Sequence, residues 1–177
     1  GTEHVNTLRL WEAKSPRTLD MALFSSGQYV RATEEQVMAQ TITKILYPND
    51  EHMEGKSLRL KQQYFFVSAT VQSLVRKHLE HYGTLKNFHE KNVIQIPAMV
   101  IPELMRILMD EAGYPWDEAW EITRSAVAYT NHTVLSEALE RWPQTLIESL
   151  LPRIWQIICE IAHRYQRRVE EFYHHND

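Results

Sequence analysis

Apolar residues recur at helical spacing along two long stretches of the chain. The first stretch runs from Lys56 to about Tyr82 and is followed by Gly83, which commonly ends a helix. The second begins at Pro152, and its apolar side chains are Ile154, Ile157, Ile158, Ile161, Tyr165, Val169 and Phe172. The pattern predicts a long helix in each stretch, and we expect the first helix to be the central buried element.

Shorter amphipathic segments predict further helices. One apolar stripe predicts a helix that starts at about Ala32 and ends at Pro48; its members are Val37, Met38, Thr41, Ile42, Ile45 and Leu46. Pro102 suits the first turn of a helix through Met109, because the missing amide costs nothing there. Two more helices are expected from Trp116 to Thr123 and from Gln144 to Leu151.

Short apolar runs are typical of strands at three places: Val5 to Trp11, Asn92 to Ile96 and Ala126 to Tyr129. Strands that alternate with helices indicate part of a doubly wound parallel sheet. Because most residues lie in the helical stretches, the sequence predicts a predominantly helical α/β fold in which long helices flank a partial parallel sheet.

Composition and charge narrow the class of protein. At 177 residues the chain is long enough for one domain, and its 19 Lys+Arg and 23 Asp+Glu form no block of like charges, so we expect no nucleic-acid partner. No apolar run approaches the roughly 18 residues that span a bilayer, and the polar start does not resemble a signal peptide. A single cysteine, Cys159 in an apolar helix stripe, excludes an internal disulfide. We expect a cytoplasmic protein without a membrane partner.

A polar turn follows the third expected strand. Thr130, Asn131 and His132 separate this strand from a helix expected to begin at Ser136. In open α/β sheets, ligand contacts lie outside the carboxyl ends of the strands, so Asn131 and His132 are candidate binding residues. The alternatives are a backbone cap at Asn131 and a structural role for His132.

The segment from Tyr129 to Trp142 reads Tyr-Thr-Asn-His-Thr-Val-Leu-Ser-Glu-Ala-Leu-Glu-Arg-Trp. Only Ser136 differs from a signature of the glycogen, starch and maltodextrin phosphorylases. The resemblance continues in three further blocks, Asn6 to Ala13, Leu46 to Ala69 and Ile101 to Thr123, in the same order along the chain. The sequence therefore resembles an internal fragment of the N-terminal domain of this family, whose members are several times longer.

The resemblance implies an activity for the parent protein. The family cleaves α-1,4-glucosidic bonds with inorganic phosphate, releases glucose 1-phosphate and uses the phosphate group of pyridoxal phosphate, which a lysine of the C-terminal domain holds. No stretch of this chain is similar to the motif of that lysine, so we expect no cofactor and no catalytic residue on the fragment, which should be inactive alone. The resemblance also implies a glycosyltransferase-B-like fold, and a homodimer through the helix that starts at about Ala32. A core helix would show the same apolar stripe.

The resemblance places four residues of this chain at the substrate site. His132 matches a histidine that hydrogen-bonds a glucose hydroxyl, and Asn131 beside it shapes the turn. Asp50 matches a mobile loop that gates the catalytic crevice in regulated members, although an Asn-Asp pair also commonly stops a helix. Glu51 departs from the asparagine that contacts sugar at that place in the family, which puts this contact in doubt.

The largest departure from the family lies between Ile96 and Pro97, where four residues, Asn-Asp-Thr-His, are missing. In the family, the aspartate of this loop orients the glucose-binding histidine, a role that other side chains rarely replace. Two interpretations stay open: the protein lacks the loop and is catalytically impaired, or the loop exists and the sequence omits it. In the first case the chain could instead be a non-catalytic carbohydrate-binding or helix-docking module.

Two Glu-x-x-His pairs, Glu160 with His163 and Glu171 with His174, have the spacing of di-iron bundles. Such sites need the motif on two different helices. Both pairs fall on one expected helix, so we expect no metal site.

Overall fold

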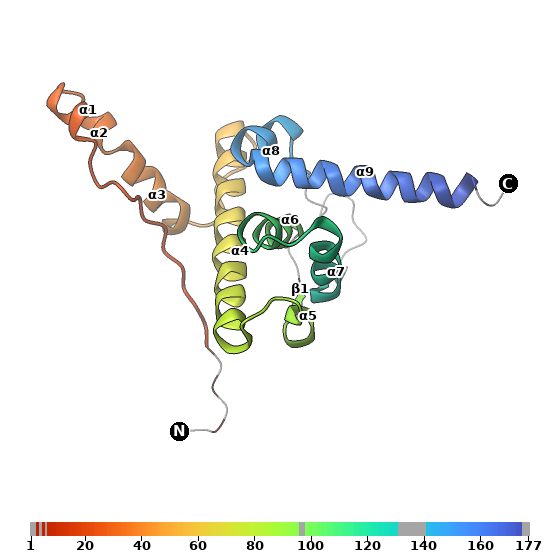
Figure 1. Cartoon of the computed structure of the whole chain (residues 1–177). Helices are drawn as coiled ribbons and strands as arrows, with labels where there is room; N and C mark the ends of the chain where they lie inside the picture. The colour runs from red at the N-terminus through yellow and green to blue at the C-terminus, as the bar shows by residue number, and fades with distance from the viewer. Residues whose placement is uncertain (1–2, 4, 6, 96–97, 131–140, 175–177) are drawn as a thin grey trace. The chain divides into compact units, whose positions relative to one another are not determined.

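The computed structural model describes residues 3, 5, 7–95, 98–130 and 141–174 (Figure 1). The chain divides into two units, Gly1–Phe66 and Val67–Asp177. The helix α4 (Met53–Tyr82) begins in the first unit and ends in the second. It starts three residues earlier than the periodicity predicts, and Gly83 follows it with a φ of +68°, as expected for a helix C-terminus.

The described residues of the first unit also form α1 (Met21–Ser25), α2 (Tyr29–Ala32) and α3 (Glu34–Lys44). Asp20 starts α1, since its carboxylate accepts hydrogen bonds from the backbone N–H groups of Ala22 and Leu23 at 3.0 and 3.1 Å. These contacts satisfy donors that a helix N-terminus leaves unpaired. The backbone N–H of Asp20 donates to the carbonyl of Ala32 at 2.9 Å, which ties the start of α1 to the end of α2.

For the first unit, one prediction is wrong and one is confirmed over a shorter range. No strand forms among the described residues between Val5 and Trp11, where the side chains of Leu8 and Leu10 are 86% and 88% exposed. A strand needs a neighbouring strand to pair with its backbone groups, and the described residues supply none here. The helix expected from about Ala32 forms as α3 and ends early, because Ile45 and Leu46 of the expected stripe lie beyond its end. None of its residues is buried, which speaks against the alternative of a core helix.

The second unit holds the short parallel sheet. Strand β1 (Ile94–Gln95) pairs with β2 (Val127–Ala128) in the register Ile94 to Val127 and Gln95 to Ala128. The two expected strands are therefore confirmed in type and shorter than predicted. The described part of the chain is a mostly helical α/β structure with a two-stranded parallel sheet.

Among the described residues of this unit, the helices after α4 are α5 (Phe88–Lys91), α6 (Val100–Arg106), the π-helix η1 (Ile107–Glu111), α7 (Trp116–Ala126), α8 (Gln144–Leu150) and α9 (Pro152–His174). The helices expected from Pro102, Trp116, Gln144 and Pro152 are confirmed, although the first continues as a π-helix. The helix α6 packs against both α7 and α9 (Figure 1). Leu104 and Met105 of α6 are fully buried, and so is Ala119 of α7. Ile154 of α9 is 2% exposed.

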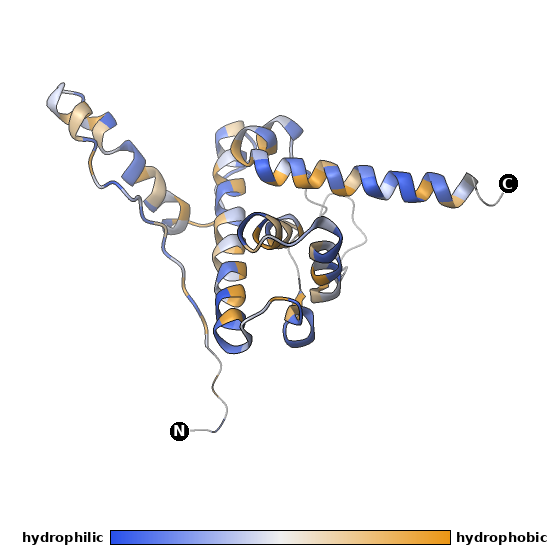
Figure 2. Cartoon of the chain, in the orientation of Figure 1, coloured by the Kyte–Doolittle hydropathy of each residue, from blue (hydrophilic) through white to orange (hydrophobic). Residues whose placement is uncertain are grey.

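Burial fades along α9. Ile154 and Ile157 are buried, whereas Tyr165 and Phe172 of the same predicted stripe are 71% and 65% exposed. Hydrophobic residues nevertheless recur along one side of this helix beyond its buried part (Figure 2). The placement of Cys159 in the apolar stripe is wrong, because this residue is exposed. No helix among the described residues combines the length and the apolar character that a bilayer crossing requires.

Candidate functional site

The loop that carries Asp50 and Glu51 folds back onto the first turn of α4. Tyr47 has a φ of +60°, a left-handed conformation that turns the chain before the loop. A Cβ placed on Gly55 would lie 1.7 Å from the backbone oxygen of Asn49, so the loop contacts the helix where only glycine leaves room. The loop is therefore packed against the helix that follows it.

Hydrogen bonds hold this loop around Asp50 and at its junction with α4. The ring Nδ1 of His52 accepts from the backbone N–H of Gly55 at 3.0 Å, and the carbonyl of His52 accepts from the N–H of Lys56 at 3.1 Å. His52 thus acts as the N-cap of α4. The side-chain oxygen of Asn49 accepts from the backbone N–H of Glu51 at 2.9 Å. The backbone on both sides of Asp50 is consequently held by contacts that do not involve the Asp50 side chain.

The Asp50 carboxylate forms an ion pair with Arg59 through Oδ2 and Nη1. Both side chains are partly open to solvent, with 43% of Asp50 and 39% of Arg59 exposed. Within the described residues, Oδ1 of Asp50 accepts no hydrogen bond, so this oxygen can still accept one from a ligand hydroxyl. Sequence reasoning missed Arg59, because Asp50 precedes the helix and helical spacing rules do not connect the two positions.

The carboxyl ends of the two strands lie in the second unit. Gln95, the last residue of β1, donates through Nε2 to Oγ1 of Thr130 at 3.0 Å. Both side chains are exposed, and they mark the edge at which a parallel sheet places ligand contacts. Asn131, His132 and the helix expected from Ser136 lie outside the described residues. The structure therefore does not place Asn131 or His132 relative to Asp50 and Glu51.

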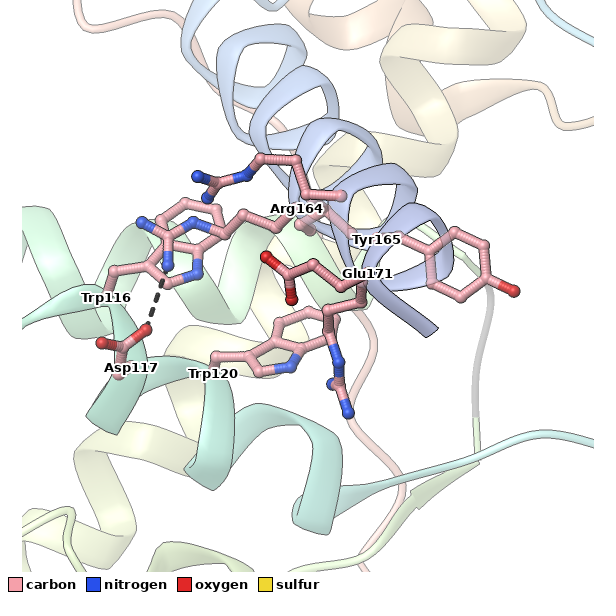
Figure 3. Close-up of a pocket in the computed structure, with 9 residues that line it drawn as sticks. Trp116, Asp117, Trp120, Arg164, Tyr165 and Glu171 are labelled. Carbon is pink, nitrogen blue, oxygen red and sulfur yellow. Dashed lines mark hydrogen bonds and ion pairs between the residues drawn. The ribbon is translucent and has the colours of Figure 1, made fainter. Parts of the chain in front are cut away.

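A hollow of about 410 Å³ lies between the first two turns of α7 and the outer half of α9 (Figure 3). Its polar centre is Arg164, whose guanidinium carbon lies 4.6 Å from the centroid of the Trp116 ring. The same guanidinium donates to Asp117 at 3.0 Å and to Glu160 at 2.6 Å. The hydrogen bond from Arg164 holds the pKa of Glu160 below its ordinary value.

The remaining walls of this hollow are mixed. The Trp120 ring lines it from α7, Glu171 points into the space between the two indole rings, and Tyr165 points away from them (Figure 3). Arg164 is already engaged by two carboxylates and an indole face, but Arg167 and Arg168 also line the hollow, which therefore combines flat apolar surfaces with charged groups. None of the residues predicted to bind substrate lines it.

The described residues contain no group of three or more His, Cys, Asp or Glu side chains placed to hold a metal ion. Glu160, from one of the two Glu-x-x-His pairs, is bound by Arg164 instead. The clearest buried charge is Glu103 of α6, which is fully buried and accepts hydrogen bonds from Arg106 at 2.8 and 2.9 Å. Ser68 of α4 donates to the same carboxylate at 2.7 Å, so Glu103 joins two helices.

The described residues form a helix-rich α/β structure around two parallel strands. Polar side chains lie at the carboxyl ends of these strands, where sheets of this class bind ligands. The family profile described as "Carbohydrate phosphorylase" matches residues 1–177. The chain therefore belongs to the carbohydrate phosphorylase family.

Individual relatives agree with this assignment. The chain is 46% identical to "Glycogen phosphorylase" of Chlamydia pneumoniae over 181 residues, which cover 100% of the chain and 22% of the relative. It is 49% identical to "Glycogen phosphorylase, muscle form" of Ovis aries, with 93% of the chain and 21% of the relative covered. For "Glycogen phosphorylase" of Synechocystis sp. the identity is 44%, over 95% of the chain and 20% of the relative. The chain thus spans about a fifth of the length of these relatives.

Proposed function

We propose that this chain is a fragment of the N-terminal domain of an α-1,4-glucan phosphorylase. The complete enzyme would cleave glycogen or maltodextrin with inorganic phosphate and release glucose 1-phosphate. The observation that carries the proposal is the family match over residues 1–177, joined by relatives named glycogen phosphorylase at 44 to 49% identity. Because the chain spans about a fifth of those relatives, it would be inactive alone.

The rest of the proposed enzyme would complete both the fold and the chemistry. The two parallel strands and the long helices support a partial doubly wound, glycosyltransferase-B-like sheet that further strands of the complete domain would extend. The family's cofactor, pyridoxal phosphate, would be held by the C-terminal domain, where its phosphate group supplies proton transfer beside the substrate phosphate. No stretch of this chain is similar to the motif of the family's cofactor-holding lysine, so none of its lysines would hold the cofactor.

The substrate contacts that we propose for this chain lie on the glucose side. His132 would hydrogen-bond a glucose hydroxyl, Asn131 would shape the turn that presents it, and the loop with Asp50 and Glu51 would border the crevice. The half-open Asp50 carboxylate with its remaining acceptor Oδ1 supports the role of this loop. A site that pairs buried hydroxyls discriminates strongly against sugars that lack them.

Self-association and location complete the proposal. We expect the complete enzyme to be a cytoplasmic homo-oligomer in which the outer face of α3 takes part. Val37 and Met38 on this helix are 57% and 45% exposed, which leaves apolar surface available for a second subunit.

The test is a phosphorolysis assay on the longer protein that contains this chain. Incubated with maltodextrin, inorganic phosphate and pyridoxal phosphate, it should release glucose 1-phosphate, whereas the 177-residue chain in the same mixture should release none. Product from the short chain would contradict the need for the missing domain. No product from a folded, cofactor-loaded long protein would contradict the proposed activity.

A further inference from the structure

We infer that Arg59 is a positioning residue that fixes the carboxylate of Asp50 for contact with a sugar hydroxyl. The inference rests on the proposed function, and it goes beyond the loop itself to a helix residue outside it. It starts from the ion pair between Nη1 of Arg59 and Oδ2 of Asp50.

The loop backbone holds its shape without this ion pair. Asn49 lies against Gly55 so closely that a Cβ on the glycine would meet the Asn49 oxygen at 1.7 Å. His52 caps α4 through Gly55 N–H, and Asn49 binds the N–H of Glu51. These contacts fix the path of the chain on both sides of Asp50, so we assign to the ion pair the orientation of the Asp50 side chain.

The Asp50 side chain is exposed enough to need such a restraint. With 43% of its surface open, a carboxylate at this place would otherwise turn among several rotamers. Arg59 lies on the second turn of α4, so its side chain extends from a rigid helix backbone. An ion pair of this exposure contributes little to folding stability, yet it removes the rotamer freedom that binding would otherwise have to restrict.

The ion pair uses only one of the two carboxylate oxygens of Asp50. Oδ2 accepts from Arg59, and among the described residues Oδ1 accepts from no donor. An ionised carboxylate offers about four lone-pair positions, so Oδ1 remains available for a hydroxyl. Hydrogen bonds to a charged acceptor are the stronger kind. Arg59 therefore acts on the sugar through Asp50, without needing to contact the sugar itself.

The experiment compares variants in the longer protein, with phosphorolysis rates measured over a range of maltodextrin concentrations. Arg59→Ala should lower kcat/KM about tenfold, mostly through a higher KM, because a freely rotating Asp50 binds hydroxyls less well. Arg59→Lys, which keeps a charge without the planar fork, should recover part of this loss. Asp50→Asn should show a loss of its own, and the double variant should lose no more than the larger single variant, because the two residues act as a unit.

A second measurement separates positioning from a structural role. Hydrogen exchange of the backbone amides of Glu51 and Gly55 should be unchanged in Arg59→Ala, since other groups hold the loop. The matched control is Arg17→Ala, an exposed arginine of the same unit, which should change neither exchange nor kinetics. An unaltered KM in Arg59→Ala would overturn the inference, and so would faster exchange at both amides.

Failure of the proposed function can be recognised separately. If the unaltered long protein releases no glucose 1-phosphate, calorimetric titration with maltodextrin still tests Arg59. Binding that weakens about tenfold in Arg59→Ala would support positioning of Asp50 for a sugar. Equal binding by Arg59→Ala and the unaltered protein would contradict it.

Discussion

Two arginine pairs of the second unit have the same spacing and different burial, which allows a sharp test of what holds α6 in place. Arg106 binds Glu103 through Nε and Nη2 at 2.8 and 2.9 Å, and Arg124 binds Glu121 through the same atoms at 2.6 and 2.9 Å. Both pairs are three residues apart along a helix. The side chain of Glu103 is 0% exposed, however, whereas that of Glu121 is 58% exposed.

The perturbation is Arg106→Ala, which leaves the Glu103 carboxylate buried without its cation. Such a change typically costs about 3 to 5 kcal/mol of unfolding free energy. Ser68 still donates to Glu103 at 2.7 Å in the variant, so we expect a value toward the lower end, about 3 kcal/mol. The matched control, Arg124→Ala, should leave the urea midpoint nearly unchanged, because the exposed Glu121 carboxylate stays hydrated without the arginine.

The assay is urea unfolding of the 177-residue chain, monitored by far-ultraviolet circular dichroism. Midpoints are compared only between variants whose m-values are equal. Replacing both members, Glu103→Leu with Arg106→Met, should recover most of the stability lost in Arg106→Ala. Equal urea midpoints for Arg106→Ala and Arg124→Ala would refute the reasoning that burial of the Glu103 carboxylate sets the loss of unfolding free energy.

Three further variants test the packing and electrostatics of the same unit. Leu104→Ala should cost about 2 to 5 kcal/mol in urea unfolding, because this side chain is fully buried, whereas Val93→Ala at a position 76% exposed should cost little. Thr123→Val should raise the unfolding free energy by about 1 kcal/mol, since within the described residues the buried Thr123 hydroxyl has no hydrogen-bond partner; a loss would count against this. The hydrogen bonds from Arg153 hold the pKa of Asp110 below its ordinary 3.8. The stability difference between the unaltered chain and Asp110→Asn should therefore be full above pH 3.8 and disappear as acid protonates Asp110, and a difference independent of pH would contradict this cause.

The sequence predicts the helices well where their own periodicity and end signals are sufficient. Gly83 and Pro152 mark real boundaries, and the buried Ile154 and Ile157 follow the predicted spacing of α9. Burial depends on which elements pack against a helix, and the periodicity of its sequence carries no information about them. Tyr165 continues the stripe and is nevertheless exposed.

Features that depend on distant partners escape local reasoning. The run from Val5 to Trp11 has the composition of a strand, but strand formation needs a neighbour that the described residues do not provide. At the candidate site, Asp50 follows from the family resemblance, whereas its partner Arg59 becomes visible only when the loop folds onto α4. The roles of His132 and Asn131 stay predictions, because both residues lie outside the described part of the chain.

The central claim is that this chain supplies the glucose-side contacts of a phosphorolytic enzyme. The most direct measurement is the rate of glucose 1-phosphate release by the longer protein carrying His132→Ala, compared with the unaltered protein at equal cofactor loading. Loss of a hydrogen bond from a desolvated sugar hydroxyl should lower kcat/KM at least about a hundredfold. A rate for His132→Ala that equals that of the unaltered enzyme would contradict the account.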